Sequence, residues 1–159
     1  MRDELIQEFC QDVREILVEL SPIIESLEFH QPIPAQLEAF GQKVDRIMGA
    51  AKSLGYESIG AISELCKAIS YKASQSKDAH LVRIATGILA EATEGLVVLV
   101  NGLDESGHEP LNDFQMSALQ SRLDFLQTKL ADIQRSSVAV DDPELAKISD
   151  VMSQLNKNK

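Results

Sequence analysis

One stretch of the sequence carries polar, charged and small residues at spacings of three and four, so a helix through it would place them on one face: Gln42, Asp45, Met48, Gly49 and Lys52. The amide of Gln42 and the carboxylate of Asp45 can together orient a water molecule for attack on a phosphoryl group. The same polar residues can equally solvate an exposed helix face. Gly41 and Gly49 each cost a helix about 1 kcal/mol relative to alanine. Two such glycines suggest that something approaches the helix backbone closely.

Few other residues of the chain suggest chemistry. The common phosphate-binding, metalloprotease, paired-cysteine and nucleophile motifs do not occur in the sequence. His30, His80 and His108 fall at expected loops or helix starts without ligand-type neighbours, and we predict that they are surface residues. Cys10 and Cys66 each lie among apolar residues, which is typical of buried reduced thiols. We therefore expect no enzyme, no metal site and no cofactor.

The chain is acidic and of single-domain length. Its 159 residues include 15 Lys and Arg against 25 Asp and Glu, a formal net charge of −10. Because nucleic acids and anionic lipids are bound mainly through basic side chains, we expect no nucleic-acid partner. The chain opens without a targeting leader, and its longest uncharged apolar stretch, residues 95–103, is too short to span a bilayer. These observations favour a cytoplasmic protein without a membrane partner.

Apolar residues recur at steps of three and four, which predicts long amphipathic helices. The first helix covers residues 5–27, and Pro22 should bend or interrupt it near residues 18–21, because proline lacks an amide hydrogen. A second helix spans about residues 35–54 and ends at Gly55. A third covers about residues 57–74.

Three further helices follow in the second half of the chain. Asp78 is a good N-cap for the fourth helix. A fifth, with a coiled-coil-like apolar stripe, covers residues 116–133, and residues 136–140 should be loose. Asp142 opens a short amphipathic helix whose end should fray. The positions of the fourth helix expected to face inward are Leu81, Ile84, Ile88, Ala92, Leu96, Leu99 and Leu103.

No stretch of the sequence has the alternation of a β-strand. Long helices with short connections pack most simply as antiparallel neighbours. We therefore predict an all-α protein, an antiparallel up-and-down four-helix bundle with one or two additional C-terminal helices. The bundle should occupy residues 1–136, and residues 137–159 should form a linker and a short C-terminal helix.

The segment from Asp45 to Tyr56, DRIMGAAKSLGY, resembles the histidine phosphotransfer (HPt) family. The signature of that family is His-x-Leu-Lys-Gly-x-Ala-x-x-Leu-Gly followed by an aromatic residue. The chain looks most like the N-terminal phosphotransfer domain of chemotaxis-type histidine kinases, and residues 5–28 are similar to its first helix. The likeness covers about residues 1–136. It implies an HPt-like bundle that acts in bacterial two-component, phosphorelay or chemotaxis signalling.

The departures from the family pattern bear directly on function. Asp45 stands where the family carries its phosphorylated histidine, and Met48 replaces the family's lysine. A carboxylate has no imidazole nitrogen to carry a phosphoryl group, so the resemblance implies a chain that has lost phosphotransfer. Gly49 stands where the family has the glycine that lets the loops of a receiver domain approach the acceptor position. By spacing, Lys67 is the counterpart of the family's histidine-binding glutamate, and we expect a charge-reversed pair with Asp45.

The first functional hypothesis is a phosphotransfer-incompetent HPt-like module. It would bind a response-regulator receiver domain or another signalling protein and act by occupancy or scaffolding. Asp45 would present a fixed negative charge and Met48 an adaptable apolar contact. A receiver's metal-binding site is itself acidic, so Asp45 would repel it unless Mg²⁺ or Lys52 intervened. The partner-binding residues of this hypothesis are Gln42, Asp45, Met48, Gly49, Lys52 and Lys67.

Two alternatives belong to other classes of protein. A phosphatase of a phosphorylated receiver would use Gln42 and Asp45 to orient water. A structural bundle without a receiver partner would instead form a homodimer through the apolar stripes of its C-terminal helices.

Overall fold

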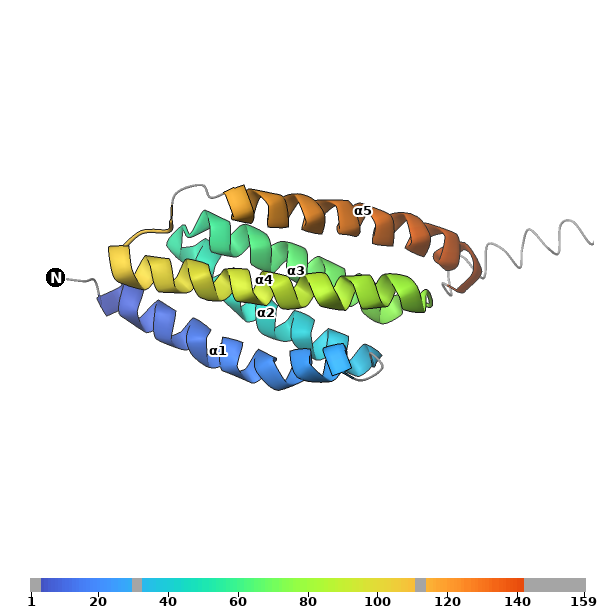
Figure 1. The fold of residues 1–159 in the computed structure, drawn as a ribbon, viewed down its shortest axis with the longest axis horizontal. Helices are drawn as coiled ribbons and strands as arrows, with labels where there is room; N and C mark the ends of the chain where they lie inside the picture. Colours follow the sequence, from blue (N-terminus) through green and yellow to red (C-terminus); the bar gives the residue numbers. More distant parts are fainter. Residues whose placement is uncertain (1–3, 30–32, 111–113, 142–159) are drawn as a thin grey trace, which may run out of the picture.

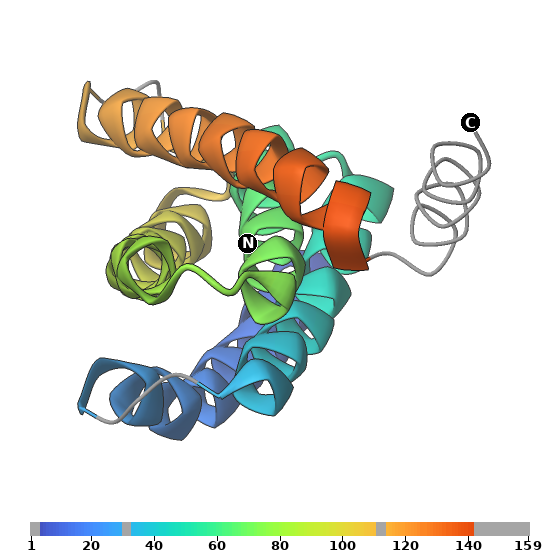
Figure 2. The same cartoon turned by 90° about the vertical axis from the view of Figure 1, so that its right-hand side faces the viewer.

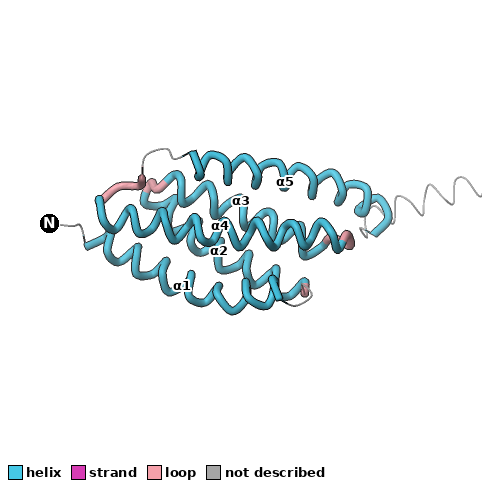
Figure 3. Tube along the Cα trace, in the orientation of Figure 1, coloured by secondary structure: helices cyan, strands magenta, loops and turns pink. Residues whose placement is uncertain are grey.

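The computed structural model describes residues 4–29, 33–110 and 114–141. No β-strand occurs in these three stretches, so the all-α prediction is confirmed (Figure 3). The helices are α1 (Glu4–Phe29), α2 (Pro34–Leu54), α3 (Glu57–Gln75), α4 (Ala79–Ser106) and α5 (Phe114–Asp141).

The first four helices form an antiparallel up-and-down bundle (Figure 1). α1 packs on α2 and α4, and α3 packs on the same two helices, which closes the ring. α5 lies outside the ring against α3 and α4, as the end-on view in Figure 2 shows. The predicted four-helix bundle with an additional C-terminal helix is therefore confirmed. The last short helix expected from Asp142 lies outside the described residues.

Local signals in the sequence set several helix ends. Gly55 ends α2 with φ 81°, a left-handed conformation that glycine adopts without steric cost, as predicted. Asp78 precedes α4 and its side chain accepts a hydrogen bond from the Leu81 amide at 3.1 Å, so this predicted cap is also confirmed. These signals hold the connections between α2, α3 and α4 short.

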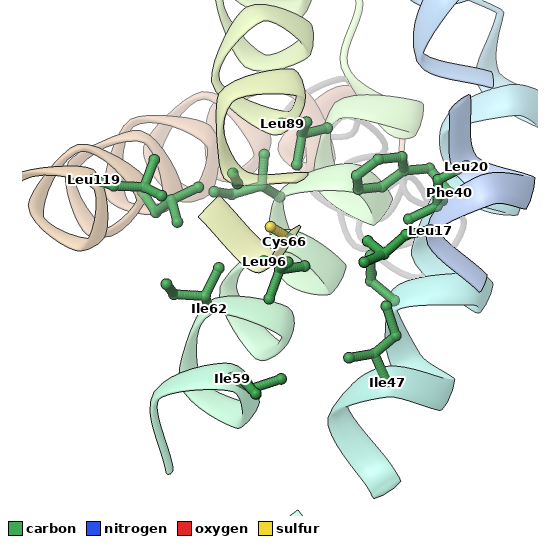
Figure 4. Packing of buried hydrophobic residues seen from close by; sticks show 14 of the residues in the cluster. Leu17, Leu20, Phe40, Ile47, Ile59, Ile62, Cys66, Leu89, Leu96 and Leu119 are labelled. Carbon is green, nitrogen blue, oxygen red and sulfur yellow. The ribbon is translucent and has the colours of Figure 1, made fainter. Parts of the chain in front are cut away.

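The apolar faces of all five helices meet in one core (Figure 4). Cys10 and Cys66 lie in it as buried thiols outside any disulfide, as the sequence predicts. Burial raises the pKa of Cys66 to about 12. The apolar stripe of α5 is buried within the chain. It is therefore not available to pair with a second chain, as the homodimer hypothesis requires. The buried residues of that stripe are Leu119, Leu123, Leu126 and Leu130.

Two predictions from the sequence are wrong, those for Ile84 and for residues 136–140. Pro22 was expected to bend or interrupt α1, and the helix continues through it without interruption. Pro22 and Val18 are both exposed, so water can hydrate the carbonyl group of Val18 that proline leaves without a donor. Ile84 was expected to face inward, but 43% of its surface is exposed. Residues 136–140, expected to be loose, belong to α5, which ends at Asp141.

α4 is apolar enough to cross a membrane by length and composition alone. Its most apolar window has a mean hydropathy of 1.4, and half of that window is buried inside the bundle. The core helix of a soluble protein has the same character. The expectation of a cytoplasmic protein without a membrane partner therefore stays a prediction.

Glu109, in the loop after α4, caps the start of α3 from 50 residues away. Its carboxylate oxygens accept hydrogen bonds from the backbone amides of Ser58 at 3.2 Å and Ile59 at 2.8 Å. Tyr56, the N-cap residue of α3, makes no side-chain cap of its own.

We predict that Glu109→Ala lowers the free energy of unfolding by about 1 kcal/mol in urea titrations, because two amides of the first turn of α3 lose their acceptor. Glu105→Ala is the matched control for loss of an acidic side chain at an exposed neighbouring site, and an equal effect there would contradict the capping role.

Candidate functional site

The six candidate residues gather on one side of the bundle, along the seam between α2 and α3. Five of them lie on the outward part of α2, and Lys67 comes from α3. Gln42, Gly49 and Lys52 are exposed, while Asp45, Met48 and Lys67 are half-buried. None of the six is sealed beneath another of the helices that the structure describes, so among these helices the face is open.

Asp45 and Lys67 form the expected pair across this seam. The Lys67 ammonium donates a hydrogen bond to Asp45 Oδ1 at 2.8 Å, and 35% and 44% of the two side chains remain exposed. The hydrogen bond from Lys67 to Asp45 raises the pKa of Lys67, so the ammonium stays charged at neutral pH. Because water reaches both groups, the pair fixes the direction of the Asp45 carboxylate more than it stabilises the fold.

Lys52 is engaged about two turns further along α2, on the same seam. Its ammonium lies 3.0 Å from Glu64 Oε2 on α3, and its stem crosses over Gly60. A methyl group added at Gly60 would come within 3.2 Å of Lys52 Cγ, so glycine makes room for this side chain. Lys52 therefore reaches Glu64 within the chain, and a partner would meet a pair of charges here rather than one cation.

The two glycines of α2 have different surroundings. A methyl group added at Gly41 would lie 2.6 Å from Ser70 Oγ and 3.1 Å from the Tyr71 ring, so α3 approaches the α2 backbone there, as the glycine suggested. At Gly49 no described atom lies within 4 Å of the added methyl. Packing within the described chain thus accounts for Gly41. Gly49 leaves helix backbone bare and exposed beside Asp45, and we call this bare position the notch.

Sequence reasoning missed a charged contact at the other edge of α2. Lys43 donates a hydrogen bond to Glu19 of α1 at 3.0 Å, and Arg46 lies 3.8 Å from the same carboxylate oxygen. The hydrogen bond from Lys43 lowers the pKa of Glu19. The antiparallel order of α1 and α2 is the signal that would have placed these acidic and basic residues opposite one another.

Charge is unevenly divided among the helices of the ring. α1 carries seven acidic residues and one arginine, and α4 carries four acidic residues and one arginine. α2 carries three basic residues and two acidic ones, and α3 carries two of each. The acidity of the ring is therefore concentrated on α1 and α4, while the side bearing Asp45 is close to neutral.

In the part of the chain that the structure describes, no three His, Cys, Asp or Glu residues are grouped as a metal site would require. His80 and His108 are exposed as predicted, and His30 lies outside the described residues. Comparison with protein-family models, with curated proteins and with solved structures finds no match to this chain.

Proposed function

We propose that the chain is a phosphotransfer-incompetent HPt-like signalling module that binds a receiver domain through the α2–α3 face and acts by occupancy. The observation that carries the proposal is the Asp45–Lys67 pair. The sequence resemblance aligns these two residues with the histidine and the glutamate of an HPt domain. The pair is half exposed on the outside of a helical bundle, as a docking site requires. Asp45 holds a carboxylate there and offers no imidazole nitrogen to a kinase.

The open notch at Gly49 supports docking at this face. A side chain at Gly49 would meet no described atom, as at Gly87 of α4, so glycine there costs helix stability and brings no packing benefit within the described chain. A partner loop that descends onto the helix next to Asp45 would account for its presence. Met48, half-buried beside the notch, would give such a loop an adaptable apolar surface.

The charge distribution favours the same face for an acidic partner. A receiver's metal-binding side would be repelled by the acidic residues of α1 and α4. It would meet a near-neutral surface on α2 and α3, where Lys67 compensates Asp45 directly. This arrangement removes much of the repulsion that an isolated Asp45 would cause.

The docking face is tested by filling the notch. We predict that Gly49→Leu weakens binding to the receiver domain at least tenfold, since a large side chain would occupy the space that the partner needs. Gly87→Leu is the matched control, because Gly87 is an exposed glycine of α4 with equally open space around it. Both changes replace glycine with a better helix former, so both variants should fold.

The partner is identified by capture from the source cell with the wild-type chain and both variants as baits. Receiver domains retained by the wild type and by Gly87→Leu, but not by Gly49→Leu, are the expected result, and calorimetry then gives each Kd. Equal binding by all three chains would place the contact elsewhere. Labelled phosphate transferred from a histidine kinase to this chain would contradict the loss of phosphotransfer.

A receiver phosphatase is the second candidate, favoured by the position of Gln42. This amide is exposed on α2 one turn before Asp45, so both groups face solvent on the same side. If hydrolysis is the function, adding the chain to a phosphorylated receiver speeds loss of phosphate, and Gln42→Ala or Asp45→Ala abolishes the effect. The occupancy proposal predicts binding with an unchanged rate of phosphate loss, so this measurement separates the two.

A further inference from the structure

We propose that the seam between α1 and α4 is a docking groove for one basic amphipathic helix of a partner protein. α4 lies between α1 and α5 in Figure 1, and the seam in question is on the α1 side. This surface does not include the Asp45 face, and the inference does not depend on the proposed function.

Three adjoining hollows form the groove. The first, of about 720 Å³, begins at Gln7, and the second, of about 410 Å³, shares Arg14 and Val18 with it. The third, of about 340 Å³, shares Leu17 and Val97 with the second and extends to Phe29. The groove therefore runs along α1 from Gln7 to Phe29, a distance of about 33 Å at the helical rise of about 1.5 Å per residue. A partner helix of about six turns would fit along it.

The middle of the groove is apolar and partly open to water. Leu17 and Val100 lie at its base, and Val18 and Val97 are 72% and 40% exposed. Ser21, a small residue, leaves room between the two helices. An apolar strip of this shape matches the stripe that a helix presents at positions i, i+3, i+4 and i+7.

The borders of the groove are acidic. Glu15, Glu25 and Glu28 line it from α1, and Glu94 and Asp104 line it from α4. Arg14 is the one cation among the described residues that line it. Arg14 lies 2.9 Å from Asp104 and donates to Asn101, so its charge is compensated within the chain. Among the described helices, α1 and α4 also hold the largest excess of acidic residues. An apolar strip between acidic borders selects an apolar helix flanked by Lys and Arg.

The groove is tested with two synthetic helical peptides of about 18 residues, about 27 Å long as helices. Both carry the same leucine stripe, and the remaining positions are lysine in one and glutamate in the other. At about 0.15 M salt, where long-range attraction is screened, we expect the lysine peptide to bind the full chain and the glutamate peptide not to bind.

Substitutions then separate the groove from general attraction to an acidic protein. Val18→Ser with Val97→Ser should weaken binding of the lysine peptide at least tenfold. The control pair, Ile84→Ser with Val98→Ser, removes exposed apolar side chains of α4 outside the groove and should change Kd less than twofold. Equal effects of the two pairs, or binding of the glutamate peptide, would overturn the proposal.

Two other occupants would also overturn the assignment to a partner helix. If the chain covers the groove with its own C-terminal segment, Ile148→Asp in the full chain would tighten peptide binding at least tenfold. If a second copy covers it, sedimentation would show a dimer that Val18→Ser with Val97→Ser dissociates. A monomer whose peptide affinity is unchanged by Ile148→Asp is the result that the proposal requires.

Discussion

Replacing Phe40 with alanine is expected to lower the free energy of unfolding by about 3 to 5 kcal/mol. Phe40 is fully buried on α2 and points into the core formed by the helices of the ring (Figure 4). Its removal loses apolar burial and leaves a cavity that the surrounding helices fill only in part. The chain has few other large aromatic groups in its core, so no neighbour of similar size can replace the ring. Chemical denaturation followed by circular dichroism measures the change.

Phe125→Ala is the matched control, since it deletes the same side chain from the outer side of α5. This phenylalanine is 65% exposed and contacts Lys129 through a cation–π interaction at 5.3 Å. Surface substitutions of this kind change stability by about 0.5 kcal/mol or less. A loss at Phe125 as large as the loss at Phe40 would mean that α5 packs through its other face, and the bundle described above would be wrong.

The helices were predictable from the sequence because burial in a bundle imposes a regular spacing on apolar residues. That spacing gave α2 and α3 to within a residue or so of their observed ends, helped by Gly55. It failed at residues 136–140, where serine and valine suggested a loop, although neither residue type excludes a helix. Periodicity also could not say where the buried stripe of α4 ends, so Ile84 was assigned to the core although it is 43% exposed.

The candidate site shows a different limit. The contact between Asp45 and Lys67 was predicted from the HPt resemblance, which indicates the residues of α2 and α3 that lie opposite one another. Composition and apolar spacing do not give this register. Gly41 and Gly49 looked alike in the sequence. Eight helical residues rotate the chain by about 80° beyond two full turns, so the two glycines point in different directions. Only the packing of α3 against Gly41 identifies Gly49 as the unexplained one.

Contacts between distant segments were the hardest to foresee. Glu109 and the first turn of α3 are 50 residues apart, and no local pattern connects them. The same holds for the acidic groove, which exists because an antiparallel bundle brings α1 and α4 together. Taken alone, the sequence of each helix predicts an ordinary amphipathic helix with a solvated face. The acidic residues of α1 and α4 border one groove only when the two helices pack side by side.

The second large effect expected is a loss of stability in alkaline solution that depends on Cys66. Burial raises the pKa of this thiol from 9.0 to about 12, so the folded chain keeps the proton that the unfolded chain releases. The unfolded state therefore binds fewer protons above pH 9, and the free energy of unfolding falls as pH rises. The full contribution is present below pH 9 and is lost progressively up to about pH 12. The slope is about 1.4 kcal/mol per pH unit, or about 2 kcal/mol by pH 10.5.

Cys66→Ala isolates this contribution, because the lysines and tyrosines contribute equally in the wild-type protein and in the variant. The variant has a cavity and is less stable near neutral pH, but that cost does not depend on pH. Urea titrations from pH 8 to 10.5 should therefore show the two stability curves converging by about 2 kcal/mol. Curves that stay parallel would mean that the thiolate forms as easily in the folded chain as in the unfolded one. Cys66 would then be open to solvent, and the helices that surround it could not be packed as the bundle requires.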